Sequence, residues 1–285
     1  MALNFLDELD ITSTGDTVLQ GFDKCQDNFE WLDDLFHGYA RRSKFRWKDA
    51  DEIYIGSGVY HHEGTVNQLV YWASELTFKL GSAGSNSDSD DLTASAWHYI
   101  YIDDTAVVTA GVKLLTETEF RNETTAPTWS ASKHGWYSGD DRCIFAVLTS
   151  AASEVLEFWH GGGNLIAHDT VHLCGTAART GGDFSAVDID TTWTDCYANI
   201  PAFSTQAAIN CHGTYSAAGG TLSWRTQGSA ADGLVIQRLN ATVAITNDNF
   251  DVITDSSGIF ELKYSSAGGE TFVVYTNGWY FPEGM

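Results

Sequence analysis

The side chains that could do chemistry are histidines and carboxylates, and their spacing gives no metal-binding motif. His61 and His62 are adjacent, and adjacent residues of a β-strand point to opposite faces, so we do not expect both imidazoles to bind one ion. His168 and His172 would share a face of a strand, but at about 3.3 Å per residue they lie roughly 13 Å apart, too far for one zinc ion. We therefore predict no metal ion and no cofactor.

Catalytic motifs are also missing. The sequence contains no GxSxG, HExxH, P-loop or Rossmann glycine pattern. Paired carboxylates, such as Asp103 with Asp104 and Asp140 with Asp141, could serve glycosidase chemistry. Because the chain has 38 acidic residues, such pairs are expected by chance. The sequence therefore predicts a protein that is not an enzyme.

Aromatic residues offer a different chemistry, the binding of flat apolar surfaces. The chain has 10 Trp and 12 Tyr, and several of them lie beside turn residues. Tyr and Trp supply rigid faces for stacking and for protein contacts, although packing inside the core is the alternative explanation for each of them. The residues predicted to contact a glycan are Trp129, Trp136, Tyr137, Trp193 and Tyr215.

The charge of the chain limits the partners it can take. The chain has 15 Lys and Arg and 38 Asp and Glu, which gives a formal net charge of −23. This charge disfavours binding to nucleic acids and to anionic membranes. The sequence has no apolar run long enough to span a membrane, so we expect no membrane insertion. The first residues lack the features of a secretory signal. Five cationic residues cluster in one short segment and form either a docking patch for an acidic surface or a complement to a preceding helix dipole: Arg41, Arg42, Lys44, Arg46 and Lys48.

The N-terminal part carries a helical pattern that the rest lacks. Apolar residues recur at alternating spacings of 4 and 3 from residue 18 to residue 39, which is typical of a helix that packs against another helix. A helix of this length is marginal alone in water, so it must be buried, either against other copies in a trimer or against the chain's own first sheet. The seam residues, predicted to form the oligomer interface, are Val18, Phe22, Cys25, Phe29, Leu32, Phe36 and Tyr39.

From Glu52 onward the pattern changes to short segments with period two, bounded by Gly, Asn, Asp and Ser. We count about fourteen candidate strands, residues 104–115 among them. This predicts an all-β fold with a short N-terminal α-helix and two antiparallel β-sandwich or jelly-roll-like domains. The predicted domains are an arm and amphipathic helix with the basic cluster over 1–48, a first sandwich over 49–178 and a second over 179–285.

Several segments resemble structural proteins of tailed bacteriophages, of the tail-fibre and receptor-binding kind. They are WHYIYID, APTWSASKHGWYSGDDRCIFAVLT and EVLEFW between Trp97 and Phe158, and the final TNGWYFPEGM. The resemblance implies a homotrimeric virion protein, assembled in the host cytoplasm, whose N-terminal helices join and attach to the virion. It implies as partners other virion proteins and a glycan or protein of the host surface. A capsid decoration or head-fibre protein and a polysaccharide-degrading tailspike enzyme remain alternatives.

Overall fold

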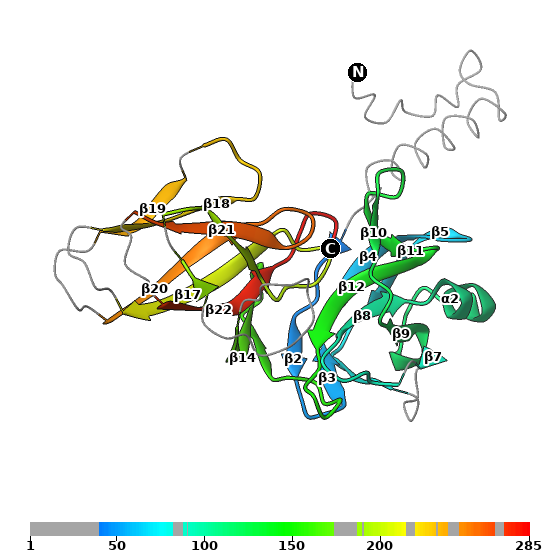
Figure 1. Ribbon diagram of the computed structural model, residues 1–285. Coiled ribbons are helices and arrows are strands. Elements are labelled where there is room, and N and C mark those ends of the chain that lie inside the picture. Colours follow the sequence, from blue (N-terminus) through cyan, green and yellow to red (C-terminus); the bar gives the residue numbers. More distant parts are fainter. Residues whose placement is uncertain are drawn as a thin grey trace, which may run out of the picture.

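A computed structural model describes residues 40–81, 88–89, 91–173, 187–189, 191–214, 220–231, 233–238, 245–265 and 271–285. Within these residues the chain is mostly β, with several antiparallel sheets and one α-helix (Figure 1). The predicted all-β character is therefore confirmed. The predicted N-terminal helix and all seven seam residues lie outside the described residues.

The first lobe contains three sheets. One sheet has the order β1 (Ala40–Arg41), β4 (Gly58–Glu63), β5 (Asn67–Trp72), and a second has the order β2 (Phe45–Trp47), β3 (Glu52–Ile55), β6 (Leu76–Lys79). The largest has the order β10 (Thr128–Ser130), β11 (Gly135–Ser138), β12 (Asp141–Leu148), β8 (Trp97–Ile102), β9 (Phe120–Glu123), β7 (Asp88–Ser89). Every residue of β8 is buried, which explains its uninterrupted run of large side chains.

One segment that the sequence predicts as a strand is a helix. Helix α2 (Asp104–Ala110) begins after Asp103, whose carboxylate accepts hydrogen bonds from the backbone of Thr105 and Ala106. It ends at Gly111, which adopts a left-handed conformation with φ of 60°. The predicted strand over 104–115 is therefore wrong, because the caps at its two ends outweigh the β-branched residues between them. A 3₁₀ turn, η1 (Glu117–Glu119), then leads into β9.

The second lobe consists of two sheets that lie one over the other (Figure 1). The larger has the order β13 (Phe158–His160), β14 (Leu165–Leu173), β22 (Thr271–Tyr280), β17 (Gln206–Thr214), β20 (Ile245–Ile253), and β15 (Val187–Asp188) also pairs with β22. The other has the order β16 (Thr194–Tyr197), β21 (Ile259–Tyr264), β18 (Thr221–Thr226), β19 (Leu234–Arg238). The rings of Tyr264 and Phe272 meet between them, with centroids 5.8 Å apart.

Strands β13 and β14 precede the predicted domain boundary in the sequence, yet they pair with the sheet of the second lobe. Leu165 of β14 lies opposite Tyr280 of β22, and Phe158 of β13 lies opposite His168 of β14. By sheet membership the change from one lobe to the other therefore falls near residue 158. The domain limits of 49–178 and 179–285 stay a prediction.

The two lobes share one aromatic core. Trp279, which is completely buried, lies with its ring centroid 5.8 Å from Phe145 and 6.3 Å from Trp97 of the first lobe. The same ring lies 5.3 Å from Phe203 and 5.0 Å from Phe281. Because the contacts of Trp279 with Phe145 and Trp97 cross from one lobe to the other, the lobes are packed as one hydrophobic unit.

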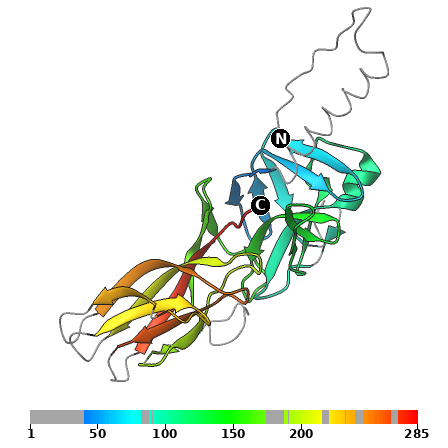
Figure 2. The same cartoon turned by 90° about the horizontal axis from the view of Figure 1, so that it is seen from above.

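The last five residues, 281–285, lie against the first lobe, where the red end of the ribbon meets the blue and green strands (Figure 2). The side chain of Met285 is buried, and its carbonyl oxygen accepts a hydrogen bond of 2.8 Å from Nε of Arg42. The carbonyl of Gly284 accepts from Nη2 of Arg142 at 3.2 Å, and that of Glu283 accepts from the indole of Trp136 at 3.0 Å. This segment therefore connects the end of β22 to strands β11 and β12.

No helix in the described part is long and apolar enough to cross a membrane.

Candidate functional site

The predicted docking patch is mostly occupied by contacts within the chain. Arg42 is partly buried under the last residues, with its guanidinium 4.1 Å from the ring centroid of Phe281. Arg46 makes two hydrogen bonds to the carboxylate of Glu75, and Lys48 pairs with a glutamate four residues on. Arg42 therefore holds the last residues against the first lobe, and its contact with an acidic partner stays a prediction.

Two members of the patch remain available. Arg41 and Lys44 are exposed, and within the described residues neither forms an ion pair with a carboxylate. Nη2 of Arg41 donates a hydrogen bond of 3.2 Å to the hydroxyl of Ser57. Arg41 is the last residue of β1, and Lys44 follows it by three residues.

The aromatic residues predicted to contact glycans lie in different environments. Tyr137 is only 3% exposed, and its hydroxyl accepts a hydrogen bond from the backbone of Glu63, so its ring offers no face to a sugar. Trp136 is partly buried against Trp129, whose ring is 41% exposed. The burial of Tyr137 argues against its predicted contact with a glycan, since a position beside a turn does not by itself decide exposure.

The second lobe gives a similar result for Trp193. The guanidinium of Arg225 lies 4.3 Å from the centroid of its ring, and the ammonium of Lys263 lies 4.6 Å from it. Cations on the aromatic face are favourable contacts in their own right, so this ring is already engaged within the chain. Tyr215 lies outside the described residues.

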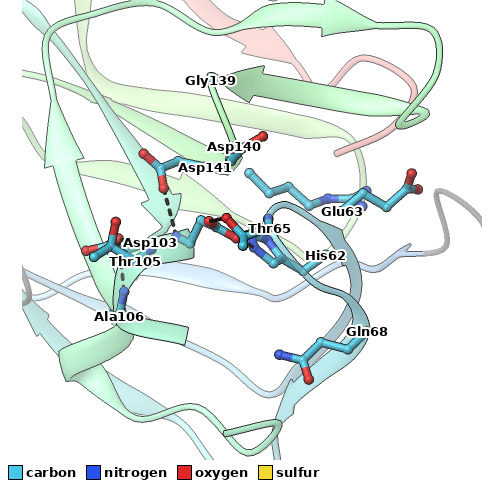
Figure 3. A network of polar contacts seen from close by, with 12 residues as sticks. His62, Glu63, Thr65, Gln68, Asp103, Thr105, Ala106, Gly139, Asp140 and Asp141 are labelled. Carbon is cyan, nitrogen blue, oxygen red and sulfur yellow. Dashed lines mark hydrogen bonds and ion pairs between the residues drawn. The ribbon is translucent and has the colours of Figure 1, made fainter. Parts of the chain in front are cut away.

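A polar cluster of the first lobe brings His62 and Thr65 close to Asp103 and Asp141 (Figure 3). At its centre lies Asp104, which is buried. Its carboxylate lies 3.0 Å from Nε2 of His62 and accepts hydrogen bonds from the backbone and hydroxyl of Thr65 at 2.9 and 2.6 Å. Gly64 lies between His62 and Thr65 in the sequence, and a Cβ at this position would collide with the carboxylate of Asp104. Both oxygens of Asp104 are therefore satisfied by a single short loop.

Neighbouring residues extend this cluster. The backbone N–H of Asp104 donates to the carboxylate of Asp141 at 2.7 Å, and that carboxylate pairs with Arg121 at 3.3 Å. His61 takes a separate partner, Glu63, at 3.1 Å. The two adjacent histidines thus serve different carboxylates and do not converge on one point. Within the described part of the chain, no group of three or more histidine, cysteine or acidic side chains could hold a metal ion.

Burial sets the electrostatics of the cluster. It lowers the pKa of His62, although the hydrogen bond to Asp104 opposes the shift. Burial acts to raise the pKa of Asp104, but the hydrogen bonds from Thr65 and His62 outweigh it, so that the pKa is lowered. Burial raises the pKa of Asp141. At neutral pH we therefore infer a neutral His62 beside an ionised Asp104.

A His–Asp pair is also the arrangement of a general base with its orienting carboxylate, but this one lacks the other requirements. The imidazole of His62 is completely buried, so a substrate cannot reach it from solvent. The nearby hydroxyl, that of Thr65, donates to Asp104 rather than to the histidine. The cluster is accordingly best explained as the polar support that joins β4 to the start of α2.

This arrangement predicts a dependence of stability on pH. Burial lowers the pKa of both His62 and His160 in the folded chain, whereas in the unfolded chain each titrates near ~6.5. Below that pH the unfolded chain binds protons that the folded chain does not, so the free energy of unfolding falls, by at most about 1.4 kcal/mol per pH unit for each histidine. Urea unfolding at several values between pH 7 and pH 5 measures this slope.

The comparison variant is His62→Gln, which keeps a polar side chain but cannot titrate. All other titrating groups are kept in this variant, so its slope is expected to be shallower than that of the original chain. Equal slopes would show that His62 does not gain its proton on unfolding. The slope against pH, rather than the absolute free energy of unfolding, is the quantity to compare, because the substitution also alters the hydrogen bond to Asp104.

Comparison with known proteins adds no further assignment. No family model matches the chain, and no curated protein matches its sequence.

Proposed function

We propose that this protein is a non-enzymatic virion component of the tail-fibre or receptor-binding kind that acts as a homotrimer. The observation that carries the proposal is the direct connection between the seam and the first sheet. Tyr39 is the last seam residue, and Ala40 already pairs with Tyr60 of β4 as the first residue of β1. Without an intervening linker, an assembly formed through the seam would hold the β-lobes at fixed positions.

The seam supports self-association because of its length. The seam of about three heptads is too short to be a stable helix alone, whereas three copies around one axis would share Phe22, Phe29 and Phe36 in a common core. Closed symmetry also explains how such a short segment could be sufficient, since each copy supplies the partner for the next. The β-lobes would then lie side by side below the helices.

The two lobes suit a rigid displayed part. In our proposal each is sandwich-like, and the aromatic core around Trp279 keeps them from moving independently. The exposed cations Arg41 and Lys44 lie beside the point where the seam enters, and they would contact an acidic surface of another virion protein. The resemblance of residues 97–158 to tail-fibre proteins supports the location in a virion.

A non-enzymatic role is favoured over polysaccharide degradation by the state of the carboxylates. A glycosidase needs two accessible carboxyl groups across the bond that is cleaved. Asp104 is hydrogen-bonded through both oxygens, and Asp103 caps helix α2. Asp140 is paired with Lys133 at 2.7 Å. These engagements leave the carboxylate pairs in structural roles.

Replacing one apolar seam residue by a charged residue tests the assembly. Phe29→Asp would bring three carboxylates to the axis of a trimer, and we expect the protein to dissociate into monomers. Light scattering coupled to size-exclusion chromatography should give a mass of three times 31.2 kDa for the original chain and 31.2 kDa for the variant.

The matched control is Gln26→Asp, which introduces the same charge outside the seam. It should keep the trimeric mass. A monomeric original chain at micromolar concentration would rule out the proposed trimer, and equal dissociation of both variants would show that charge alone, rather than the seam, is responsible.

A further inference from the structure

The outer face of the larger sheet of the second lobe carries a row of cross-strand neighbours whose two ends, Trp159 and Asp251, are exposed, while the small residues between them are partly exposed or buried. By the strand register, Trp159, Ala167, Gly278, Ala208 and Asp251 are successive cross-strand neighbours on β13, β14, β22, β17 and β20. Cross-strand neighbours share a face. Trp159 is 62% exposed, whereas Phe158 and His160 on either side of it are buried.

The centre of the row is formed by small residues. Gly278 is needed for packing, since a Cβ there would collide with the backbone of Ile166 on the neighbouring strand. Together with Ala167 and Ala208 it leaves a strip without large side chains between Trp159 and Asp251. Neighbouring strands are spaced by about 4.8 Å, so the strip extends roughly 19 Å across the sheet.

A second aromatic ring borders the strip. Tyr280 follows Gly278 by two residues on β22, is partly exposed, and donates a hydrogen bond of 2.8 Å from its hydroxyl to Asp251. It lies two strands from Trp159, about 10 Å across the sheet. The indole of Trp159 is held in a similar way, by a 3.0 Å hydrogen bond from its Nε1 to Asp169. Both rings are thus fixed in position by a carboxylate.

The other border is formed by amides. The side-chain oxygen of Asn249 accepts hydrogen bonds from the amides of Asn210 and Asn277 at 3.0 and 3.1 Å. Asn249 is exposed, and because its oxygen accepts two hydrogen bonds, its amide nitrogen points away from these partners. The carboxylates of Asp251 and Asp169 each have a second oxygen that can accept a hydrogen bond from a ligand. The strip is therefore surrounded by two rings that hydrogen bonds hold in place and by amide and carboxylate groups that keep further polar atoms for a ligand.

The charge of this sheet restricts the ligand. The five strands β13, β14, β22, β17 and β20 contain no Lys or Arg, and the whole chain has a net charge of −23. Phosphate, sulfate and acidic sugars would therefore be repelled. A neutral sugar fits better, because its C–H face can stack on an aromatic ring while its hydroxyls exchange hydrogen bonds with amides and carboxylates.

We propose that the outer face of the sheet β13–β14–β22–β17–β20 binds an uncharged polysaccharide, with Trp159 and Tyr280 stacking on sugar rings and Asp251 and Asn249 binding their hydroxyls. This inference rests on the proposed attachment role and names the ligand class for it. Trp159 takes the place of the aromatics that the sequence indicated, since its face is open and the faces of Tyr137 and Trp193 are engaged.

Affinity electrophoresis of the full chain tests the proposal. Native gels contain dextran, mannan or galactan as neutral probes, or polygalacturonate as an acidic probe. We expect at least one neutral polysaccharide to retard the original chain and polygalacturonate to have no effect. Trp159→Ala should weaken the retardation about tenfold or more, as expected for the loss of a central aromatic anchor.

Two further variants make the result specific. Tyr71→Ala removes another exposed aromatic ring, in the first lobe, and should be retarded like the original chain. Asn249→Ala leaves both aromatic rings in place and should weaken binding as well. The proposal is overturned if no neutral probe retards the original chain, if Trp159→Ala is retarded equally, or if the acidic probe binds better than the neutral ones.

Light scattering of the same samples separates this proposal from the proposed function. A trimer that no neutral polysaccharide retards overturns the sugar-binding face and leaves the assembly standing. A monomer that is retarded supports the face and overturns the trimer. An unchanged mass and an unchanged circular dichroism spectrum of Trp159→Ala would show that its loss of binding is local.

Discussion

Trp279→Ala is expected to lower the free energy of unfolding by about 3–5 kcal/mol, in the range for a large aromatic residue removed from a core. The indole is completely buried and lies among Trp97 and Phe145 of the first lobe and Phe203 of the second. No neighbouring ring can fill the resulting cavity without leaving its own contacts. Urea unfolding followed by far-ultraviolet circular dichroism measures the change.

The matched control is Trp159→Ala, in which the same side chain is lost from an exposed position. Its effect should stay below about 1 kcal/mol, as is usual for surface substitutions. Similar losses from both variants would contradict the assignment of Trp279 to a core shared by the two lobes. A transition that separates into two steps only for Trp279→Ala would show that this residue couples the lobes.

Arg142→Ala should have the second largest effect, about 3 kcal/mol, because it removes a buried cation that satisfies several acceptors. The guanidinium is completely buried and donates to the carbonyls of His61 and Gly284 and to the hydroxyl of Tyr137. Without it these groups lose a charged donor in a region closed to water. The last residues should also detach more easily from the first lobe.

The comparison for this variant is Arg46→Ala. Arg46 is exposed, and although it makes a two-point contact with Glu75, exposed pairs contribute little, so the urea midpoint should hardly move. Limited proteolysis near the end of the chain adds a second readout, since only Arg142→Ala should accelerate cleavage there. Equal midpoints for the two arginine variants would contradict the clamp formed by Arg142.

Much of the fold could be predicted from the sequence because period-two alternation depends only on neighbouring residues. Strands β3, β8 and β21 lie within segments of this pattern, and β12 begins one residue before such a segment. Helix α2 was missed because Val107 and Val108 favour strands, whereas the capping contacts of Asp103 and Gly111 decided the conformation. Short helices between strands are decided by their ends more than by their interior.

The candidate sites were harder to predict, because they depend on pairing between distant residues. Trp159 lies in a short strand, and only the strand register places it in one row with Asp251. The partners of Arg42 and Arg142 are likewise the last residues of the chain. The basic cluster in the sequence predicted an exposed Arg42, whereas its contact with Met285 leaves that side chain partly buried.

The central claim is that the seam of one copy is buried by the seams of two others. An electron cryomicroscopy map of the purified full chain tests it most directly. The account predicts three copies around one axis, with Phe22, Phe29 and Phe36 of each facing that axis and Ala40 leading straight into the first sheet. A single copy whose seam packs on its own β-lobe would contradict the homotrimer, and with it the proposed role in attachment.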